Sequence, residues 1–473
     1  MRCLGGINSV RRWAVRSARG QFDWRNESRA RSARPTDWFP FHRGITGSTE
    51  WTRLGRGLLF AIVFGADSCG NVLLGAEPAP LRVCLVAAEG RPVGGLDELK
   101  AALEKARGFE GIVVTVARDT SGGRSLDALR SAEAAVFHRG PGALGADDTA
   151  ILREFLGSGK GLVVLGAADD AWQAAPGFMA DVLGATAGPE FAHGAPMSVI
   201  NLLPHPIYTG VVRFETSHAM PAFTKLADDI QLIMEGTVGE DTTPLAWVRC
   251  RPPGRVFHLV PAAPDLLNDS SYQRIVANAV LWTCGRPIPG AQPIVQRTFM
   301  PDSYPGAIAI AFPNGPGVCL DPVRGGINYI WDGDFVDLRP RWLTKQGAPA
   351  RIFGETFYRE KLWQPLRLGA PGSEPNFHFR GYTLKADGPE FHYEIDGRDV
   401  FETIRALEDG KGIARHFRVS PGKQALWVNL EAQPGADVVA RGVERDGNTC
   451  CFPSHAAGEF TIEIRRKTGG AIP

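Results

Sequence analysis

The chain has 473 residues, a formal net charge of +1 and a hydrophobic fraction of 44%. This length allows about two or three domains, each with a sizeable core, and the near-neutral charge argues against nucleic acid or an anionic membrane as a general partner. The 56 glycines and 35 prolines indicate many turns and a large β content.

Residues 1–57 are rich in arginine and show no apolar period. We interpret them as an extension that is disordered or precedes the natural start of translation. A nucleic-acid-binding arm is the alternative, but nothing downstream supports it.

Residues 58–80 have the composition of a secretory signal segment. An apolar run from Leu58 to Ala66 follows Arg53 and Arg56, and the small residues Gly75 and Ala76 come after it. The run is too short for a comfortable transmembrane helix, and a buried core helix is the alternative. We therefore expect an exported protein, periplasmic or extracellular, without an integral membrane segment in its mature form.

Residues 81–286 alternate between strand and helix patterns. Apolar runs that predict buried strands lie at residues 81–87, 111–117, 134–137 and 161–166. Helical spacing of apolar residues lies between them at residues 96–106 and 147–156, and again at residues 271–284. Residues 244–249 and 254–260 predict a pair of strands joined by a Pro-Pro-Gly turn. Strands that are apolar on both faces are typical of a parallel sheet covered by helices.

Residues 287–295 form a proline-rich linker, and residues 296–473 show little helical period. Alternating segments there, such as 377–383, 390–395 and 412–419, are separated by Asp-Gly turns. This pattern predicts a C-terminal all-β sandwich domain.

Four segments of the first half resemble the ThuA-like (trehalose utilisation) family. They lie at residues 152–165, 204–210, 243–258 and 268–282, in the order in which the family has them. The resemblance spans most of residues 81–285. It implies a flavodoxin-like α/β domain of the class I glutamine amidotransferase type.

In true amidotransferases of this fold, a cysteine nucleophile follows a strand at a sharp elbow. The equivalent stretch here, Gly166 to Trp172, contains no Cys, Ser or Thr. Acyl transfer needs an activated nucleophile beside a base, so we do not expect glutamine hydrolysis by that route. Histidines that the family tends to keep are also missing, near Ala167 and after Val260.

The ends of parallel strands are where open α/β sheets hold ligands. The candidate catalytic residues there are Asp169, Asp170, His193 and His138, and the candidate substrate-binding residues are Glu89, Arg139 and Trp172. A carboxylate or an imidazole at this edge is suited to hold sugar hydroxyls or to move a proton. The structural alternatives are a helix cap for the aspartates and a surface turn for the segment from His138 to Gly142.

Other polar residues are less informative. His205 belongs to a His-Pro-Ile turn, so we favour a structural role, and His218 completes a site only if the fold brings it near. The metal requirement and the cofactors remain unknown. The cysteines show no zinc-like spacing, and the chain has no CxxCH haem motif. One or two disulfides are compatible with export.

The second half resembles, over about residues 296–418, a β module of exported bacterial proteins that carry c-type cytochrome or sugar-processing domains. Its aromatic residues are either a sugar-binding platform or sandwich core, and we favour the core; they are Trp331, Trp342, Trp363, Phe391 and Tyr393. Glu390, His392 and Glu394 alternate and should share one face of a strand, most simply a solvated one.

These features together predict an exported protein of carbohydrate metabolism that binds or processes a glycoside or keto-sugar. A small carbohydrate is the expected ligand. The alternative is a non-catalytic scaffold that docks a c-type cytochrome or a sugar-degrading enzyme.

Overall fold

The structure is a computed structural model that describes the chain from residue 80 to residue 467. Within these limits it leaves out residues 88–95, 106–111, 118–125, 139–145, 167–176, 178, 192–196, 202–203, 213–214, 217–219, 239–240, 252–253, 264, 339, 341–346, 361, 363, 387, 431–432 and 454–457. The Arg-rich extension and nearly all of the predicted signal segment therefore lie outside the described residues.

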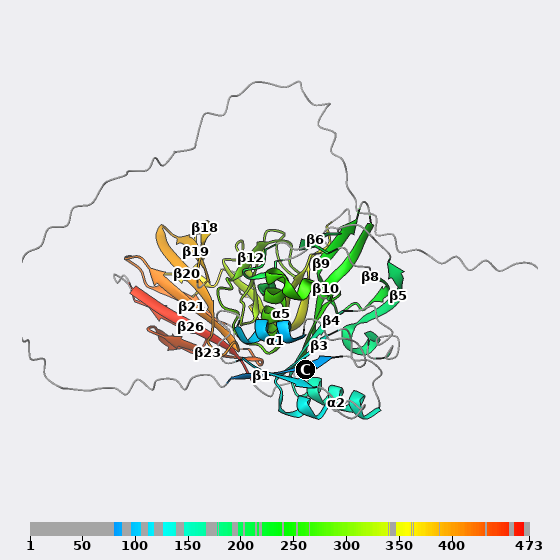
Figure 1. The fold of residues 1–473 in the computed structure, drawn as a ribbon. Helices are drawn as coiled ribbons and strands as arrows, with labels where there is room; N and C mark the ends of the chain where they lie inside the picture. Colours follow the sequence, from blue (N-terminus) through cyan, green and yellow to red (C-terminus); the bar gives the residue numbers. More distant parts are fainter. Residues whose placement is uncertain are drawn as a thin grey trace, which may run out of the picture. The chain divides into compact units, whose positions relative to one another are not determined.

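The first half of the described chain is built on a nine-stranded sheet (Figure 1). Its first elements are β1 (Leu81–Ala87), α1 (Leu96–Lys105), β2 (Ile112–Ala117), β3 (Ala134–His138), α2 (Ala146–Gly157) and β4 (Gly161–Leu165). The strands β1 to β4 pair in parallel, as their apolar composition predicts, and β11 (Gly254–Leu259) runs parallel to β4.

Helices cover both faces of this parallel part. On one face lies α5 (Ser270–Thr283), where the Arg255 guanidinium sits 5.1 Å from the centre of the Trp282 ring. On the other lies α2, where a Cβ atom on Gly254 would come within 2.8 Å of the Leu156 carbonyl oxygen. Since successive residues of a strand point to opposite faces, Arg255 and Gly254 identify the two helix layers. Figure 1 shows α1 and α5 on one side of β1 and β3, and α2 on the other.

The rest of this half is antiparallel, and the sequence predicted only part of it. The strands are β5 (Ala185–Phe191), β6 (Met197–Asn201), β7 (Glu215–Thr216), β8 (Met220–Leu226), β9 (Gln231–Val238) and β10 (Asp241–Arg251). The sheet has the order β2-β1-β3-β4-β11-β10-β9-β6-β7, and β5 pairs with β8 separately. The predicted hairpin is confirmed, since Arg251 of β10 pairs with Gly254 of β11.

Short helical turns connect several of these strands. They are the 3-10 helices Leu126–Ser131, Pro206–Tyr208 and Leu266–Asn268 and the π-helix Met179–Leu183.

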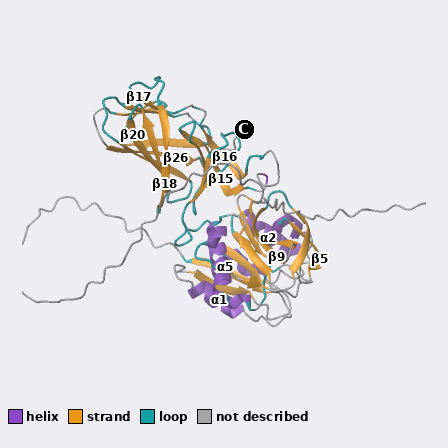
Figure 2. Cartoon of the chain, turned by 90° about the horizontal axis from the view of Figure 1, so that it is seen from above, coloured by secondary structure: helices purple, strands orange, loops and turns teal. Residues whose placement is uncertain are grey.

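From residue 294 onward the described chain is rich in antiparallel sheets, and the three labelled helices of Figure 2 all belong to the first half. The strands are β12 (Ile294–Arg297), β13 (Ile308–Ala311), β14 (Gly317–Asp321), β15 (Gly326–Asp337), β16 (Arg351–Arg359), β17 (Leu366–Leu368), β18 (Phe377–Lys385), β19 (Gly388–Ile395), β20 (Arg398–Ala406), β21 (Gly412–Val419), β22 (Leu426–Asn429), β23 (Ala436–Arg441), β24 (Glu444–Asp446), β25 (Thr449–Phe452) and β26 (Gly458–Arg466). They form sheets of five strands (β12 to β16 in order), four strands (β17-β22-β25-β24) and six strands (β18-β19-β20-β21-β26-β23). One hydrophobic cluster draws residues from all three sheets, so they share a core.

This core also contains a buried ion pair. Arg415 donates from Nε to Glu402 Oε1 at 2.6 Å, and the two side chains are 1% and 0% exposed. Tyr393 donates its hydroxyl hydrogen to the other carboxylate oxygen at 2.9 Å. Burial lowers the pKa of Arg415, but the Glu402 carboxylate more than offsets this and keeps it above its ordinary value. Arg415 is therefore charged although it is buried, and it needs the Glu402 carboxylate as its partner.

Candidate functional site

The carboxyl ends of the parallel strands form one aligned edge. Ala87 pairs with His138, and His138 pairs with Leu165, which in turn pairs with Leu259. The chain leaves β1 for β2 on one side, whereas β3 lies on the other side of β1. The strand order therefore reverses between β1 and β3, which is where doubly wound sheets bind ligands.

His138 is the predicted site residue that the structure describes at this edge. It ends β3 beside β1, and only 3% of its surface is exposed. Gly161 of β4 contacts Thr283 of α5, so Leu165 and its neighbour His138 point to the face that α5 covers. The imidazole thus lies at the carboxyl end of β3, on the face of the sheet that α5 covers. The strand order reverses beside it, between β1 and β3.

A second histidine, His258, was not singled out from the sequence, and it forms a hydrogen bond with the residue that follows β4. Gly166 adopts a left-handed conformation with φ of 88°, and its N–H donates to the Leu259 carbonyl oxygen at 2.9 Å. The Gly166 carbonyl oxygen lies 3.1 Å from Nε2 of His258. Because a carbonyl only accepts, Nε2 carries the hydrogen. Strand β11 therefore forms hydrogen bonds with both the N–H and the carbonyl oxygen of Gly166, the residue that follows β4.

His258 is buried beside an aromatic ring. Its ring is fully buried and meets Trp247 edge-on, with ring centres 4.3 Å apart and an interplanar angle of 88°. Burial lowers the pKa of His258 to about 4, against the opposing effect of the hydrogen bond to Gly166. The imidazole is therefore neutral at pH 7 and acts as a hydrogen-bond donor to the turn rather than as an exposed base.

Two described thiols of this half, Cys250 and Cys284, are poor nucleophiles. Burial, helped by Glu133, raises the pKa of Cys284 to about 12, and burial also raises the pKa of Cys250. A nucleophilic cysteine needs a lowered pKa. Cys250, Cys284, Cys319, Cys450 and Cys451 form no disulfide bond within the described part of the chain. This agrees with the missing amidotransferase nucleophile.

The structure leaves most of the predicted edge residues untested. Glu89, Arg139, Asp169, Asp170, Trp172 and His193 all lie outside the described residues, and so does His218. The six edge residues belong to the segments that follow the strands β1, β3, β4 and β5, so their proximity to His138 stays a prediction.

His205 lies elsewhere and has a structural role, as its Pro-containing turn suggested. Its Nδ1 accepts a hydrogen bond from the backbone N–H of Ile207 and caps a short 3-10 helix. Its Nε2 lies 3.5 Å from Oδ1 of Asp334 in β15, and the side chains are 0% and 6% exposed. Burial raises the pKa of Asp334, but His205, the Phe335 N–H and Arg255 together outweigh this and leave it below its ordinary value.

The proposed aromatic platform is not present in the described part. Trp331, Phe391 and Tyr393 are completely buried in the β region, which confirms the core interpretation for these three. Trp342 and Trp363 lie outside the described residues. Glu390, His392 and Glu394 do share one face of β19, because Phe391 and Tyr393 between them are buried.

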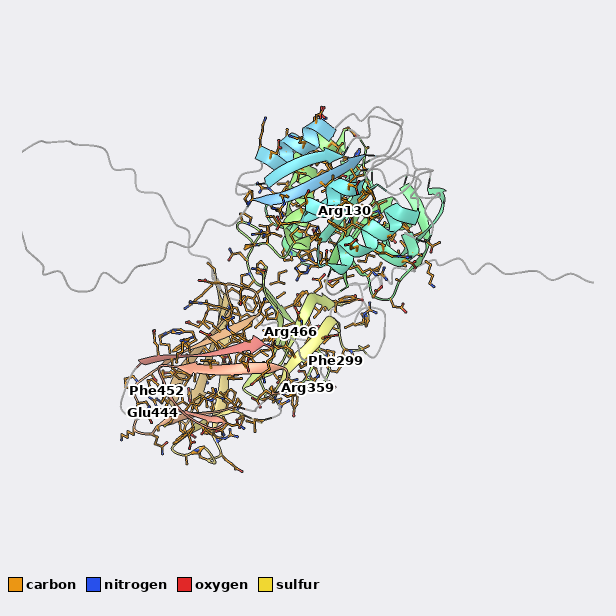
Figure 3. All side chains as sticks on the ribbon, turned by 90° about the horizontal axis from the view of Figure 1, so that it is seen from below. Arg130, Phe299, Arg359, Glu444, Phe452 and Arg466 are labelled. Carbon is orange, nitrogen blue, oxygen red and sulfur yellow. The ribbon has the colours of Figure 1, made fainter. Side chains whose placement is uncertain are left out.

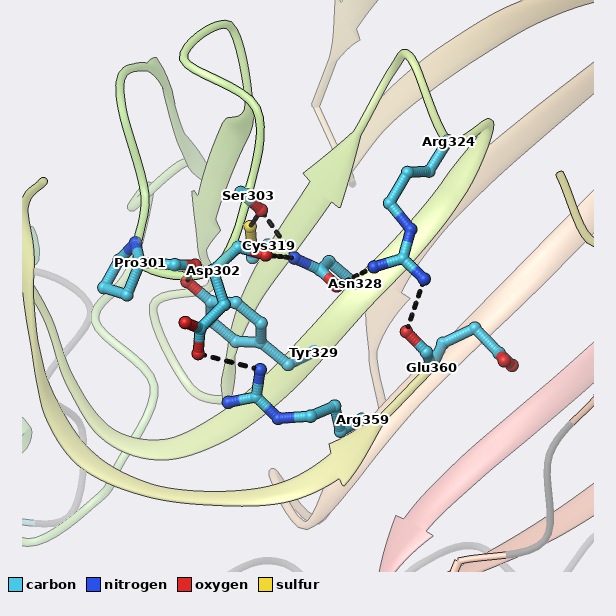
Figure 4. Close-up of polar contacts among 9 residues, drawn as sticks. All are labelled: Pro301, Asp302, Ser303, Cys319, Arg324, Asn328, Tyr329, Arg359 and Glu360. Atoms are coloured by element: carbon cyan, nitrogen blue, oxygen red, sulfur yellow. Dashed lines mark hydrogen bonds and ion pairs between the residues drawn. The ribbon is translucent and has the colours of Figure 1, made fainter. Parts of the chain in front are cut away.

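The β region contains a polar cluster that the sequence did not reveal (Figure 4). Ser303 lies 3.2 Å from the Cys319 sulfur and accepts a hydrogen bond from Asn328 at 2.6 Å. Arg324 links Asn328 to the Glu360 backbone carbonyl. Burial raises the pKa of Cys319 to about 11, so the thiol is neutral and serves as a hydrogen-bonding group. The only signal in the sequence was the turn-rich stretch from Pro301 to Gly306.

Other features of the described residues do not define a site. A small pocket of about 120 Å³ lies at the opposite edge of the sheet, lined among others by Arg130, Glu154 and Lys160. Figure 3 labels Arg130 in this half and Arg359 in the β region. The described His, Cys, Asp and Glu side chains contain no group of three or more that is suited to hold a metal ion. None of the described helices has the length and apolar character needed to cross a membrane.

The comparison with protein families supports the fold. Residues 92–283 match the ThuA family, which is described as trehalose utilisation. This match covers the part of the chain in which the sequence segments resemble the ThuA-like family, and it supports that resemblance. No curated protein matches the chain.

Solved structures show weak similarity. The chain is 12% identical to a ThuA-like protein from Bacteroides uniformis, with a TM-score of 0.36 over 44% of this chain and 93% of that one. It is 14% identical to a ThuA-like protein from Parabacteroides merdae, with a TM-score of 0.35 over 44% of this chain and 91% of that one. It is 17% identical to the carbohydrate deacetylase Agd3, with a TM-score of 0.34 over 50% of this chain and 37% of that one.

Proposed function

We propose that this chain is an exported ThuA-like protein of carbohydrate metabolism that binds or processes a glycoside or keto-sugar at the carboxyl edge of β1, β3 and β4. The observation that carries the proposal is the position of His138 at the reversal of strand order, within a domain that matches the trehalose utilisation family.

The chemistry of this edge favours hydrogen bonding and proton transfer over covalent catalysis. The stretch from Gly166 to Trp172 lacks a nucleophile, and the thiols of Cys250 and Cys284 have raised pKa values. In the proposal, Asp169 and Asp170 accept hydrogen bonds from sugar hydroxyls, and one of them acts as a base together with His193. His138 supplies a polar group to the wall of the crevice, and Glu89, Arg139 and Trp172 line its mouth.

A binding experiment tests the proposal. The chain from Glu77 onward is titrated calorimetrically with trehalose, other disaccharides and their 3-keto derivatives, and turnover is followed by product analysis. We expect at least one sugar to bind, and Asp169→Asn, Asp170→Asn and His138→Asn each to weaken binding about ten-fold, the effect of one lost hydrogen bond to a charged or buried group. His416→Asn is the control, since this histidine lies a third exposed on β21 of the other half.

The outcomes separate the alternatives. Absence of binding by every sugar contradicts the carbohydrate function. Binding without turnover favours the non-catalytic protein, which docks a cytochrome or a sugar-degrading enzyme. Unchanged binding in the three edge variants moves the site away from this edge.

Export has its own test. We expect the mature protein to begin after Ala76 and to appear outside the cytoplasm, because residues 58–76 have the composition of a secretory signal. Mass spectrometry of the protein from its native source measures the first residue. A cytoplasmic protein that starts at Met1 contradicts export.

A further inference from the structure

Two polar contacts connect the first half of the chain with the β region, although their residues lie far apart in the sequence. His205 faces Asp334 of β15, with 3.5 Å between Nε2 and Oδ1. Gln231, the first residue of β9, donates from Nε2 to the carbonyl oxygen of Val336, also in β15, at 3.3 Å. All four residues are buried. A short stretch of β15 therefore lies against the first half.

Strand β15 is irregular at this stretch. Its pairing with β16 shifts register between Asp334 and Val336. Gly333 has φ of 131°, and a Cβ atom there would clash with the Phe353 carbonyl oxygen. Trp331 donates from its indole N–H to the Asp334 carbonyl oxygen at 2.8 Å and so holds the irregular backbone. Because a β-bulge re-aims a side chain, this irregularity explains how one carboxylate of β15 comes to face the other half.

The hydrogen bonds of His205 direct its ring hydrogen towards Asp334. Its Nδ1 accepts a hydrogen bond from the backbone N–H of Ile207 at 3.3 Å, and a nitrogen that accepts carries no hydrogen. The ring hydrogen is therefore on Nε2, the atom that faces the Asp334 carboxylate. His205 thus connects the 3-10 helix Pro206–Tyr208 on one side with β15 on the other.

Asp334 is a buried carboxylate that depends on the first half. Within the β region, its Oδ1 accepts a hydrogen bond from the backbone N–H of Phe335 at 2.7 Å. Burial raises the pKa of Asp334, but His205, this N–H and Arg255 together keep the pKa below its ordinary value. His205 and Arg255 belong to the first half. Since a buried charge is strongly destabilising without its partners, the first half makes the position of Asp334 tolerable.

The contact continues into helix α5. The His205 ring meets the Trp282 ring of α5 edge-on, with ring centres 5.3 Å apart. Arg255 stacks on the same Trp282 ring and donates to its backbone carbonyl oxygen at 3.0 Å. Asn278 of α5 donates to the Ile207 carbonyl oxygen at 2.8 Å. The turn that follows His205 and the helix that covers one face of the parallel sheet are therefore both joined to the contact with β15.

The apolar cores of the two halves are separate among the described residues. One hydrophobic cluster contains buried residues from Leu81 to Ile288, and the other two contain buried residues from Met300 onward. The described contacts between the halves at β15 are therefore polar. Polar contacts depend on the exact identity of both partners, so a single substitution is sufficient to break one.

We propose that His205 and Asp334 form a latch between the two halves, through which the β region stabilises the Pro206–Tyr208 turn and α5. An event in the β region that displaces β15 withdraws the carboxylate from His205 and loosens this turn. The first half thus senses the state of the β region. The latch does not depend on which ligand the crevice takes, and its test needs no sugar.

The test is hydrogen–deuterium exchange of the full chain, followed by mass spectrometry. The N–H groups of Tyr208, Thr209 and Val211 are hydrogen-bonded within the turn, so their exchange reports its opening. We expect Asp334→Ala, a change in the β region, to speed this exchange about ten-fold, the effect of one lost hydrogen bond to a charged group. If this variant does not fold, Asp334→Asn takes its place.

The matched control is Asp337→Ala, which removes another buried carboxylate from β15. Its ion-pair partner, Arg351 at 3.1 Å, belongs to the β region. This variant should leave exchange of the turn unchanged, because its carboxylate faces a partner in its own half.

A double-variant cycle measures the latch itself. His205→Phe keeps a ring beside Trp282 but has no nitrogen to face Asp334. Asp334→Asn should lower the urea midpoint of the unmodified chain more than it lowers that of His205→Phe, because residues in contact are not additive.

Three results would overturn the proposal. One is unchanged exchange of the turn when Asp334 is replaced. Another is equally faster exchange in Asp337→Ala, which would show that any loss of stability in the β region has this effect. The last is an additive cycle, which would mean that His205 and Asp334 contribute independently.

Discussion

His258 should make the ThuA-like domain sensitive to acid. Its pKa falls from the ordinary 6.5 to about 4 in the folded chain because the ring is completely buried. The His258 imidazole of the unfolded chain therefore binds a proton more readily than that of the folded chain. The contribution of His258 to the free energy of unfolding is present above pH 6.5 and is lost as the pH falls towards 4. Each pH unit in this window costs about 1.4 kcal/mol, and the loss between pH 6.5 and 5 is about 2 kcal/mol.

Replacement of His258 by Phe should remove this sensitivity. The phenyl ring keeps the edge-on contact with Trp247, but the Gly166 carbonyl oxygen loses its donor. We expect the variant to be about 2 kcal/mol less stable than the unmodified chain at pH 7.5. Because only the unmodified chain loses stability from this group on acidification, the two should become equal near pH 5.

Urea denaturation followed by tryptophan fluorescence, from pH 7.5 to pH 4.5, measures both curves. His416→Asn is the control for the loss of an imidazole elsewhere in the chain, because its ring lies on β21 and is a third exposed. Parallel curves for the unmodified chain and His258→Phe would refute the reasoning, since they would mean that His258 takes up no proton on unfolding.

Three other sites test the packing of the fold by urea denaturation. Arg415→Met leaves the Glu402 carboxylate buried without its partner and should lower the free energy of unfolding by about 3–5 kcal/mol. The double variant Arg415→Met with Glu402→Gln should recover most of this loss. An equal loss in both variants would show that the unpaired charge is not the cause. Gly317→Ala places a methyl group inside the Trp331 indole and should cost about 1–3 kcal/mol, and an unchanged midpoint would contradict that contact. Asp269→Ala removes the N-cap of α5 and should cost about 1 kcal/mol, while Asp269→Asn should retain most of the stability.

The parallel half of the first sheet was predictable because its pattern is local. Continuous apolar runs such as Leu81–Ala87 and Gly161–Leu165 indicate strands buried on both faces, and the helices between them show their own period. The antiparallel strands β5 to β9 carry weaker patterns, and their pairing depends on distant segments. The sequence therefore predicted only the hairpin of β10 and β11 there.

The candidate site was only partly predictable for a related reason. His138 was found because it ends a clear strand, and the strand order of the sheet then put it beside β1. His258 was missed because nothing in its own segment shows that its ring reaches the Gly166 carbonyl oxygen, 92 residues away in the chain.

The sequence by itself determined the alternation of elements, the ThuA-like character of the first half, the β content of the second and the absence of a nucleophile after β4. These follow from local periodicity and from the identity of single residues. Only the tertiary structure decided which strands are neighbours, which aromatic residues are core, and that Ser303 contacts Cys319 and Asn328. Those outcomes depend on contacts between residues far apart in the chain, and no local pattern encodes the partner of such a contact.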